Sequence, residues 1–546
     1  MRRLDIAGLL LSVASSAFAQ HDHARPPAGG PVRLLQDLGQ YTHPVRTRSP
    51  EAQRFFDQGL RLAYGFNHDE AERAFREAAR LDPSCIMAWW GVALVLGPNI
   101  NWPMDEEHHR AAWAAISEAR KLLPQAAEPE AAYVRALAQR YAADPAADRA
   151  QLDRVYATAM RELSQRYPDD PDAAVLFAEA LMDLRPWHYW RTDGTPEEGT
   201  LEIVEVLETV LKRYPAHPGA NHYYIHAVEA SPHPERALAS AERLRTAVPG
   251  AGHLVHMPSH IYMRTGDYAQ AAQANAMAAK VDEAYIAAEN PQGFYPLMYY
   301  AHNVHFLAAA SAMDGRYADA KQNADKLYAF AAPGTRKMPM AEFFLPTPVY
   351  VAARFQRWNE LLAFPEPDTS FAATHALWQF GRALAFAAGG KLNEAHAAQQ
   401  RFEQESPKVA SDTPWGTTNV VGNVLRVAQL VLEARLTEAA GDRPKAIALW
   451  KQAVEAQDQL TYDEPEIWYY PTRESLGGAL LRAGQAAEAE RVFRQDLERH
   501  PRNARALFGL WRSLQAQQRS PEAAWVEREF QAAWQHADGT LRVEDL

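Results

Sequence analysis

The chain has 546 residues, one cysteine and a formal net charge of −12 at pH 7. This acidic balance disfavours nucleic acids and anionic membranes as partners, because both attract basic patches. A single cysteine excludes an intramolecular disulfide. A chain of this length is too large for one compact core, so we expect several domains or a repeat array.

Residues 1–19 have the features of a secretory signal peptide. Two arginines precede the apolar run 6–13, and Ala-Phe-Ala at 17–19 has the small-x-small pattern of a cleavage site. The run is too short to cross a bilayer, and no later segment is long and apolar enough to do so. We therefore expect a mature protein without a membrane span, in the periplasm or secreted.

The stretch 55–83 carries small and aromatic residues at fixed offsets, namely Gly59, Ala71, Phe75, Ala78 and Pro83. Ala71, Phe75 and Ala78 are three and four residues apart, which places them on one face of a helix. Asp82-Pro83 is a helix stop. These offsets resemble those of the tetratricopeptide repeat family, whose unit has about 34 residues.

The same pattern recurs to the end of the chain, with inter-helix turns predicted at Gly266, Gly315, Gly390, Gly441 and Gly484. The resemblance covers residues 51–535. It implies an all-α fold, a tetratricopeptide-type α-solenoid in which antiparallel helix pairs form a right-handed superhelix. With its signal peptide, the chain resembles an exported bacterial member of that family.

Irregular segments interrupt or flank the repeats. Those rich in proline, glycine, serine or threonine, some with tryptophan, are 97–106, 184–199, 331–348 and 405–418. We expect them to be loops over one mouth of the solenoid, where they either wall off a pocket or pad the superhelix. Residues 20–50 are predicted to form a flexible leader, and residues 536–546 a frayed tail.

Seven histidines share a few positions of the repeat frame: His222, His226, His253, His256, His260, His302 and His305. These positions are three and four residues apart and form one stripe on a helix. The resemblance implies that first helices line the concave groove and that the stripe points into it. Over three repeats, seven of nine such positions are histidine, where chance would supply about 0.3.

A stripe of imidazoles indicates a metal site. A histidine pair at i and i+4 can converge on one ion, and packed helices about 8–10 Å apart bring further rings within reach. Nearly pure imidazole suits copper, zinc, iron or nickel rather than calcium or magnesium. Export to an oxidising compartment and the Irving–Williams order favour copper, with zinc or iron as alternatives.

Seven candidate ligands exceed the need of one ion, so one or two ions are expected. Two ions, each held by three helical histidines, would resemble the dicopper centres of tyrosinases and haemocyanins in ligand type alone. The acidic residue on the stripe is Glu229. It is a candidate catalytic residue that could also ligate the metal or orient a histidine.

The sequence thus predicts an exported metalloprotein, with copper as the favoured ion, that performs oxidative chemistry as an oxidoreductase. Its substrate would be a small molecule or a peptide in the concave groove. Two other functions stay open. One is a periplasmic scaffold that binds a peptide or protein partner without catalysis, and the other is metal storage or delivery. Phosphate-loop and nucleophile-elbow motifs are lacking, which leaves hydrolase and nucleotide-dependent functions without support.

Overall fold

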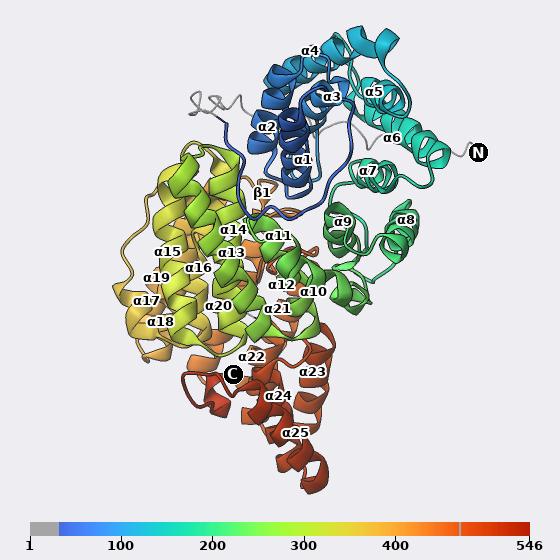
Figure 1. Cartoon of the computed structure of the whole chain (residues 1–546). Coiled ribbons are helices and arrows are strands. Elements are labelled where there is room, and N and C mark those ends of the chain that lie inside the picture. Colours follow the sequence, from blue (N-terminus) through green and yellow to red (C-terminus); the bar gives the residue numbers. More distant parts are fainter. Residues whose placement is uncertain (1–31, 469–470) are drawn as a thin grey trace, which may run out of the picture.

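The computed structural model describes residues 32–468 and 471–546, so the predicted signal peptide at 1–19 lies outside the described residues. In the described part of the chain, successive helices pack as pairs from the first to the last, and strand is confined to one short hairpin. The fold is therefore an all-α solenoid of the tetratricopeptide type, as the repeat pattern predicted (Figure 1). None of the helices in these residues combines the length and apolar character needed to cross a bilayer.

The N-terminal half contains two short 3₁₀ helices, η1 (Leu123–Gln125) and η2 (Pro234–Ala237). Its α-helices are α1 (Pro50–Tyr64), α2 (His68–Leu81), α3 (Ile86–Val95), α4 (Glu106–Leu122), α5 (Glu130–Ala138), α6 (Arg149–Arg166), α7 (Pro171–Met182), α8 (Thr200–Arg213), α9 (Pro218–Val228), α10 (Leu238–Ala247), α11 (Gly252–His256), α12 (Pro258–Thr265) and α13 (Tyr268–Glu289).

The C-terminal half begins with a π-helix, η3 (Tyr295–Tyr300), and contains an antiparallel hairpin of β1 (Pro414–Trp415) and β2 (Asn419–Val420). Its 3₁₀ helices are η4 (Pro339–Phe344), η5 (Ser406–Lys408) and η6 (Val543–Asp545). Its α-helices are α14 (Ala301–Met313), α15 (Tyr317–Thr335), α16 (Thr347–Arg354), α17 (Trp358–Ala363), α18 (Ala372–Ala388), α19 (Leu392–Glu405), α20 (Val421–Ala439), α21 (Arg443–Asp458), α22 (Thr472–Arg482), α23 (Ala486–Arg499), α24 (Ala504–Ala516) and α25 (Ser520–Ala533).

The small residues of the repeat pattern let neighbouring helices approach closely. Phe75 on α2 is fully buried, and its ring fills the space beside two glycines. A Cβ atom would lie 2.7 Å from this ring at Gly59 and 2.5 Å from it at Gly91. Since real Cβ contacts are longer than this, α1, α2 and α3 can pack together only because both positions lack a side chain.

The predicted turn at Gly266 separates α12 from α13 and also contacts the distant end of the chain. Gly266 has φ of +80°, a left-handed conformation that glycine adopts at little cost. A Cβ there would lie 2.1 Å from the carbonyl oxygen of Pro501. The hydroxyl of Tyr268 donates to the same oxygen at 3.0 Å. The C-terminal repeats thus pack against the middle of the solenoid.

The stretches predicted as loops differ in how irregular they are. Residues 97–106 and 184–199 connect α3 to α4 and α7 to α8 with little helix. Residues 331–348 instead contain the end of α15, all of η4 and the start of α16, so local hydrogen bonding continues through much of that stretch. One irregular segment was not predicted from the repeat pattern. It follows α21, and its described part is residues 459–468.

Residues 32–49, the described part of the predicted leader, lie against the first repeats. The backbone N–H of Leu35 donates to Gln58 on α1 at 2.8 Å. Nδ1 of His43 lies 2.7 Å from a carboxylate oxygen of Asp172 on α7. Leu38 is buried in the same core as α1 and α3. This part of the leader is therefore held by side chains from two helices.

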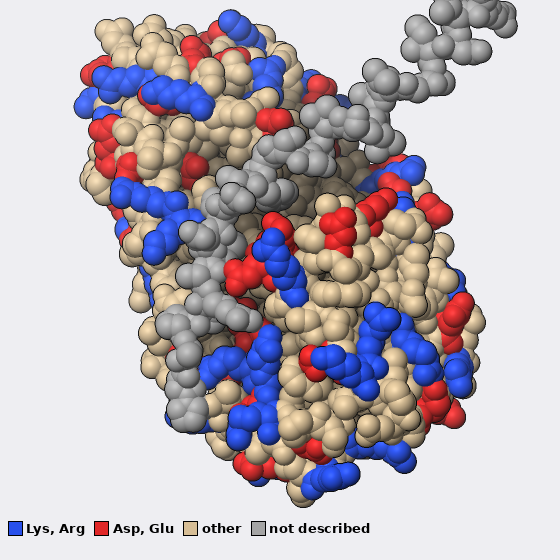
Figure 2. Space-filling view, turned by 90° about the horizontal axis from the view of Figure 1, so that it is seen from above, with Lys and Arg blue, Asp and Glu red and all other residues tan. Residues whose placement is uncertain are grey.

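Two large hydrophobic cores divide the molecule, one in the N-terminal half and one from α14 onward. The helices that carry the candidate ligands, α9, α11, α12 and α14, lie in the middle of the view, where these halves meet (Figure 1). On the face seen from above, lysine and arginine side chains are interspersed with aspartate and glutamate (Figure 2). That face therefore presents no continuous basic field.

Candidate metal centre

Six of the predicted ligands form two groups of three at the junction of the two halves. The first histidine group consists of His222, His226 and His253, and the second histidine group consists of His256, His260 and His302. In each group, the candidate ligand atoms all lie within 4.8 Å of one another. Helix α9 supplies the first two rings, α11 and α12 supply the next three, and α14 supplies His302.

The break between α11 and α12 keeps the histidines of both on one stripe. Pro258 lacks the N–H that would continue the helical hydrogen bonds, so the helix divides there. Met257 nevertheless has helical angles, φ −51° and ψ −35°, and its N–H donates to the carbonyl of His253 at 3.1 Å. The turn stays helical, and His256 therefore stays in line with His260 at i+4.

In the first histidine group, hydrogen bonds hold the Nδ1 side of two rings. Nδ1 of His222 donates to the carbonyl oxygen of Tyr64 at 2.6 Å, and Nδ1 of His226 donates to Glu229 at 2.7 Å. The Nε2 atoms of these two rings face each other at 3.0 Å. Nε2 of His253 lies 3.2 Å from Nε2 of His222. Three nitrogens thus converge on one point.

The second histidine group repeats this arrangement. Nδ1 of His256 donates to Oδ1 of Asn275 at 2.6 Å, and Nδ1 of His260 donates to Glu229 at 2.5 Å. Their Nε2 atoms lie 2.7 Å apart. The ring of His302 completes the group, with its centroid 4.7 Å from that of His256.

In the first histidine group, these tautomers turn the lone pairs of His222 and His226 toward each other. A neutral imidazole that donates from Nδ1 has only a lone pair at Nε2, so the facing Nε2 atoms of these two rings repel unless a cation lies between them. Two nitrogens on one tetrahedral ion at zinc- or copper-like bond lengths are about 3.3 Å apart. The Nε2 spacings of 2.7–3.2 Å are close to this value. The arrangement can therefore receive a transition-metal ion with little movement.

Burial keeps most of these rings in the neutral form that binds metal. It lowers the pKa well below the ordinary value for His222, His253, His256 and His302. Burial also lowers the pKa of His226, although Glu229 opposes this effect. His260 differs, because Glu464 and Glu229 outweigh burial and raise its pKa to about 10. A metal at the second group must therefore displace a proton held on His260.

Glu229 lies between the two groups and contacts a ring of each. Burial alone would raise its pKa, but His260 and His226 lower it below the ordinary range. It is an ionised carboxylate that holds both rings by Nδ1. These contacts fit an orienting role, which is one of the three roles predicted for Glu229, since ligating histidines usually donate their other N–H to such a group.

Sequence reasoning missed Glu464, which also contacts Nδ1 of His260. It comes from the irregular segment after α21, as does Tyr462, whose hydroxyl donates to Glu229 at 3.3 Å. Burial raises the pKa of Glu464 well above its ordinary value. No repeat pattern covers residues 459–468, so the sequence offered no signal for a carboxylate that arrives from the other half of the molecule.

An aromatic side chain from one of the predicted loops, Trp187, covers the first histidine group. The ring of Trp187 meets that of His226 edge to face at 5.0 Å. The indole N–H of Trp187 donates to Asn101 at 3.1 Å, and the amide of Asn101 donates to the hydroxyl of Tyr299 at 2.9 Å. Trp187 and Asn101 thus connect the segments 184–199 and 97–106 beside this group.

His305 lies in neither histidine group. Its ring packs against Phe343 and Phe344, with centroids 6.0 and 5.4 Å away, and burial lowers its pKa to about 3. The repeat frame does not transfer to this unit, because His305 follows His256 by 49 residues rather than 34. The long α13 and the π-helix η3 fill the difference. As a result, α14 directs only His302 toward the other rings.

His43, Asp170 and Asp172 form a further group whose atoms meet the same spacing. Asp172 already accepts hydrogen bonds from the hydroxyls of Tyr41 at 2.7 Å and Tyr64 at 2.5 Å. It also contacts His217 at 3.2 Å. These contacts use the carboxylate to hold residues 32–49 on α7, and they leave it little capacity for an ion.

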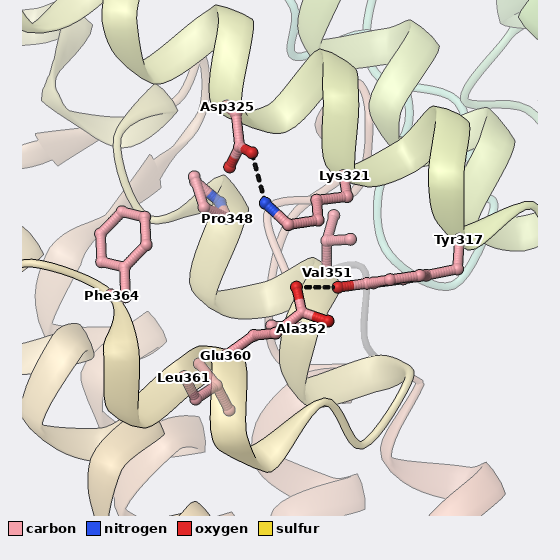
Figure 3. Close-up of a pocket in the computed structure, with 9 residues that line it drawn as sticks. All are labelled: Tyr317, Lys321, Asp325, Pro348, Val351, Ala352, Glu360, Leu361 and Phe364. Atoms are coloured by element: carbon pink, nitrogen blue, oxygen red, sulfur yellow. Dashed lines mark hydrogen bonds and ion pairs between the residues drawn. The ribbon is translucent and has the colours of Figure 1, made fainter.

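A small pocket of about 40 Å³ lies among α15, α16 and α17 (Figure 3). Inside it, Lys321 pairs with Asp325, and the hydroxyl of Tyr317 donates to Glu360. Its size suffices for a few water molecules. None of the six grouped histidines lines it, so the candidate metal centre is separate from this pocket.

No protein-family model matches the chain, and no curated protein matches it in sequence. Among solved structures it is similar to the APC/C hetero-tetramer Cut9-Hcn1, with 13% identity over 86% of this chain and 78% of that chain, at a TM-score of 0.31. It is also similar to yeast Tom70, with 12% identity over 87% and 96% and a TM-score of 0.32. The human IFIT1 dimer with m7Gppp-AAAA shows 12% identity over 82% and 90%, at 0.33. The fold assignment therefore depends on the helix pairs themselves.

Proposed function

We propose that this chain is an exported metalloprotein that binds transition-metal ions, copper in the first place, through the two histidine groups. One observation carries the proposal. The rings of His222, His226, His256 and His260 are each held through Nδ1, by Tyr64, Glu229 or Asn275, and their Nε2 atoms face one another in pairs at 3.0 and 2.7 Å. This arrangement holds lone pairs in place for a cation and has no use in an apolar core.

We further propose oxidative chemistry on a small molecule or a peptide as the use of the metal. Imidazole ligands without thiolate suit copper, and copper supports such chemistry in an exported protein. Within this proposal, Glu229 orients His226 and His260, and the aromatic wall of the first group excludes water. Zinc or iron would fill the same donor set, and a storage or delivery role would use the same ligands.

Metal analysis of the purified, untagged chain tests the proposal. We expect copper, zinc or iron to co-purify or to be taken up at a stoichiometry of at least one per chain. His256→Ala and His260→Ala should remove metal and leave helix content, measured by circular dichroism, close to that of the parent. The exposed His396 offers a matched control, since His396→Ala should change neither quantity. Metal that remains at background in the parent chain contradicts the proposal.

A scaffold that binds a partner without catalysis is the second candidate, and one surface favours it. A groove of about 620 Å³ runs between α5 and α6, with Arg135, Arg154 and Arg166 among its lining residues. Its volume falls in the range of ligand sites, and three arginines against one carboxylate, Glu162, in its lining suit an acidic peptide. Binding of an acidic peptide that Arg154→Glu abolishes and His256→Ala leaves unchanged would support this function.

A further inference from the structure

The two histidine groups differ in their access to solvent. We infer that the protein holds two metal ions that exchange with solvent at different rates. The ion in the first histidine group is enclosed and exchanges slowly, and the ion in the second group exchanges fast. This inference rests on the proposed metal binding and deepens it. The ion in the second histidine group would contact the substrate, and the ion in the first histidine group would be held permanently.

Two ions are expected rather than one because the rings of the two groups point apart. Glu229 accepts from Nδ1 of His226 with one oxygen and from Nδ1 of His260 with the other. The two nitrogens of an imidazole point in widely different directions, so each ring turns Nε2 away from Glu229 and into its own group. The Nε2 atoms of His226 and His260 therefore serve different groups, although the centroids of the two rings are 5.3 Å apart.

The first histidine group is closed on several sides. His222, His226 and His253 are 0%, 2% and 3% exposed. The ring of Phe66 lies 4.5 Å from that of His222 and stacks on that of His253 at 5.4 Å. Trp187 covers His226, and the ring of Tyr299 lies 4.9 Å from that of His253. An ion held here can leave only when these side chains move.

The cover over the first group is under local strain. Trp187 has φ of +64°, a left-handed backbone conformation that is costly for a large side chain. Its indole N–H bond to Asn101 connects the loop 184–199 to the loop 97–106. Two separate loops thus meet over the first histidine group, and the hydrogen bond between them holds Trp187 in its place over the ring of His226.

The second histidine group has an open side. His256 and His260 are buried, but the residue His302 is only half-buried. The aromatic neighbour shared by its three rings is Phe306, at 5.0 Å from His256, 5.1 Å from His260 and 5.4 Å from His302. A small ligand or a chelator can therefore approach an ion here from the side of His302.

Chelator challenge of the full, untagged chain loaded with Cu²⁺ alone tests the inference. Two ions per chain are expected after loading and desalting. On addition of excess EDTA, one ion should leave in a fast phase, and the other should leave at least roughly tenfold more slowly, since its release requires local opening. Loss of both ions in a single phase would overturn the inference.

Variants assign each phase to its group. His302→Ala should abolish the fast phase and keep the slow ion, and His253→Ala should do the reverse. Trp187→Ala should keep two ions per chain but accelerate the slow phase, which a merely structural role of Trp187 would not produce. His233→Ala, at an exposed site, serves as the control and should change neither phase.

The outcomes separate the inference from the function on which it rests. A parent chain that binds no copper contradicts the proposed function itself. A chain that binds one ion, or two that exchange alike, leaves metal binding intact and overturns only the unequal pair. If His302→Ala does not fold, Trp187→Ala still decides the matter, because its stoichiometry and its slow phase are measured on a chain that keeps all six ligands.

Discussion

Two repeats of this solenoid place different residues at the same point of their frame. In the repeat of α22 and α23, the ring of Phe493 fills the space beside Gly477, where a Cβ would lie 2.3 Å from it. In the repeat of α11, α12 and α13, Ser259 stands in the place of Gly477 and Asn275 in the place of Phe493. The second residue follows the first by 16 positions in both repeats.

The same position of the repeat fills space in one unit and orients a histidine ring in the other. Phe493 and Asn275 are both 0% exposed, but the ring only fills volume, whereas Oδ1 of Asn275 accepts from Nδ1 of His256 at 2.6 Å. The hydroxyl of Ser259 lies 3.3 Å from the same nitrogen. The scaffold is thus shared between the repeats, and the chemistry depends on a few replaced residues.

The largest effect on stability is expected from a substitution of Phe493, the residue that fills space in its repeat. Phe493→Ala should lower the free energy of unfolding by about 3–5 kcal/mol, because it leaves a cavity between α22, α23 and α24. Urea unfolding followed by circular dichroism measures this loss. Metal content should not change, since Phe493 lies in a different core from the histidines. A loss below about 1 kcal/mol would mean that the helices collapse onto the cavity.

A smaller effect, on copper binding, is expected from a substitution of Asn275, the residue that orients His256. Asn275→Leu keeps the volume but removes the acceptor for His256, so we expect roughly 10–100-fold weaker copper binding at the second histidine group. Competition with a chelator of known affinity measures the change. Asn275→Asp retains an acceptor and should restore much of the affinity, and Asn323→Leu on α15 is the control. Unchanged affinity in Asn275→Leu would show that Asn275 serves packing alone.

The smallest effect concerns a histidine of the packing repeat. The side chain of His500 is 13% exposed, and Glu466 and Asp496 outweigh the effect of burial and raise its pKa from 6.5 to about 10. A raised pKa stabilises the fold fully below pH 6.5, and this stabilisation is lost as the pH rises through about 10. From pH 7 to pH 8, the free energy of unfolding should fall by at most about 1.4 kcal/mol from this group.

The His500 effect can be measured from urea midpoints across this pH range. His500→Gln should flatten the dependence, because it removes the titrating group and retains a hydrogen-bond donor. The same slope in parent and variant would assign the dependence to other residues. The histidines of the metal groups offer the contrast, because burial lowers the pKa of His222 and His256 and keeps them neutral over this range.

Much of the fold and part of the site could be predicted from local pattern. Gly59 and Phe75 sit at repeat offsets, and the pair His256 and His260 is four residues apart on one helix. The division into two groups was open, and the place of His305 was misjudged, because the 34-residue frame does not continue through η3 into α14. Asn275 carried a usable signal, since an amide stood where the repeat has phenylalanine.

The sequence by itself determined the helical repeat and the stripe of imidazoles, because both depend on spacings within one helix or one repeat. The tertiary structure alone decided which rings meet, that Glu229 connects them, and that Glu464 reaches His260 from more than 200 residues away. Helix periodicity fixes the direction of a side chain relative to its own axis. Contacts between distant segments depend on how whole helices stack, which no local spacing encodes.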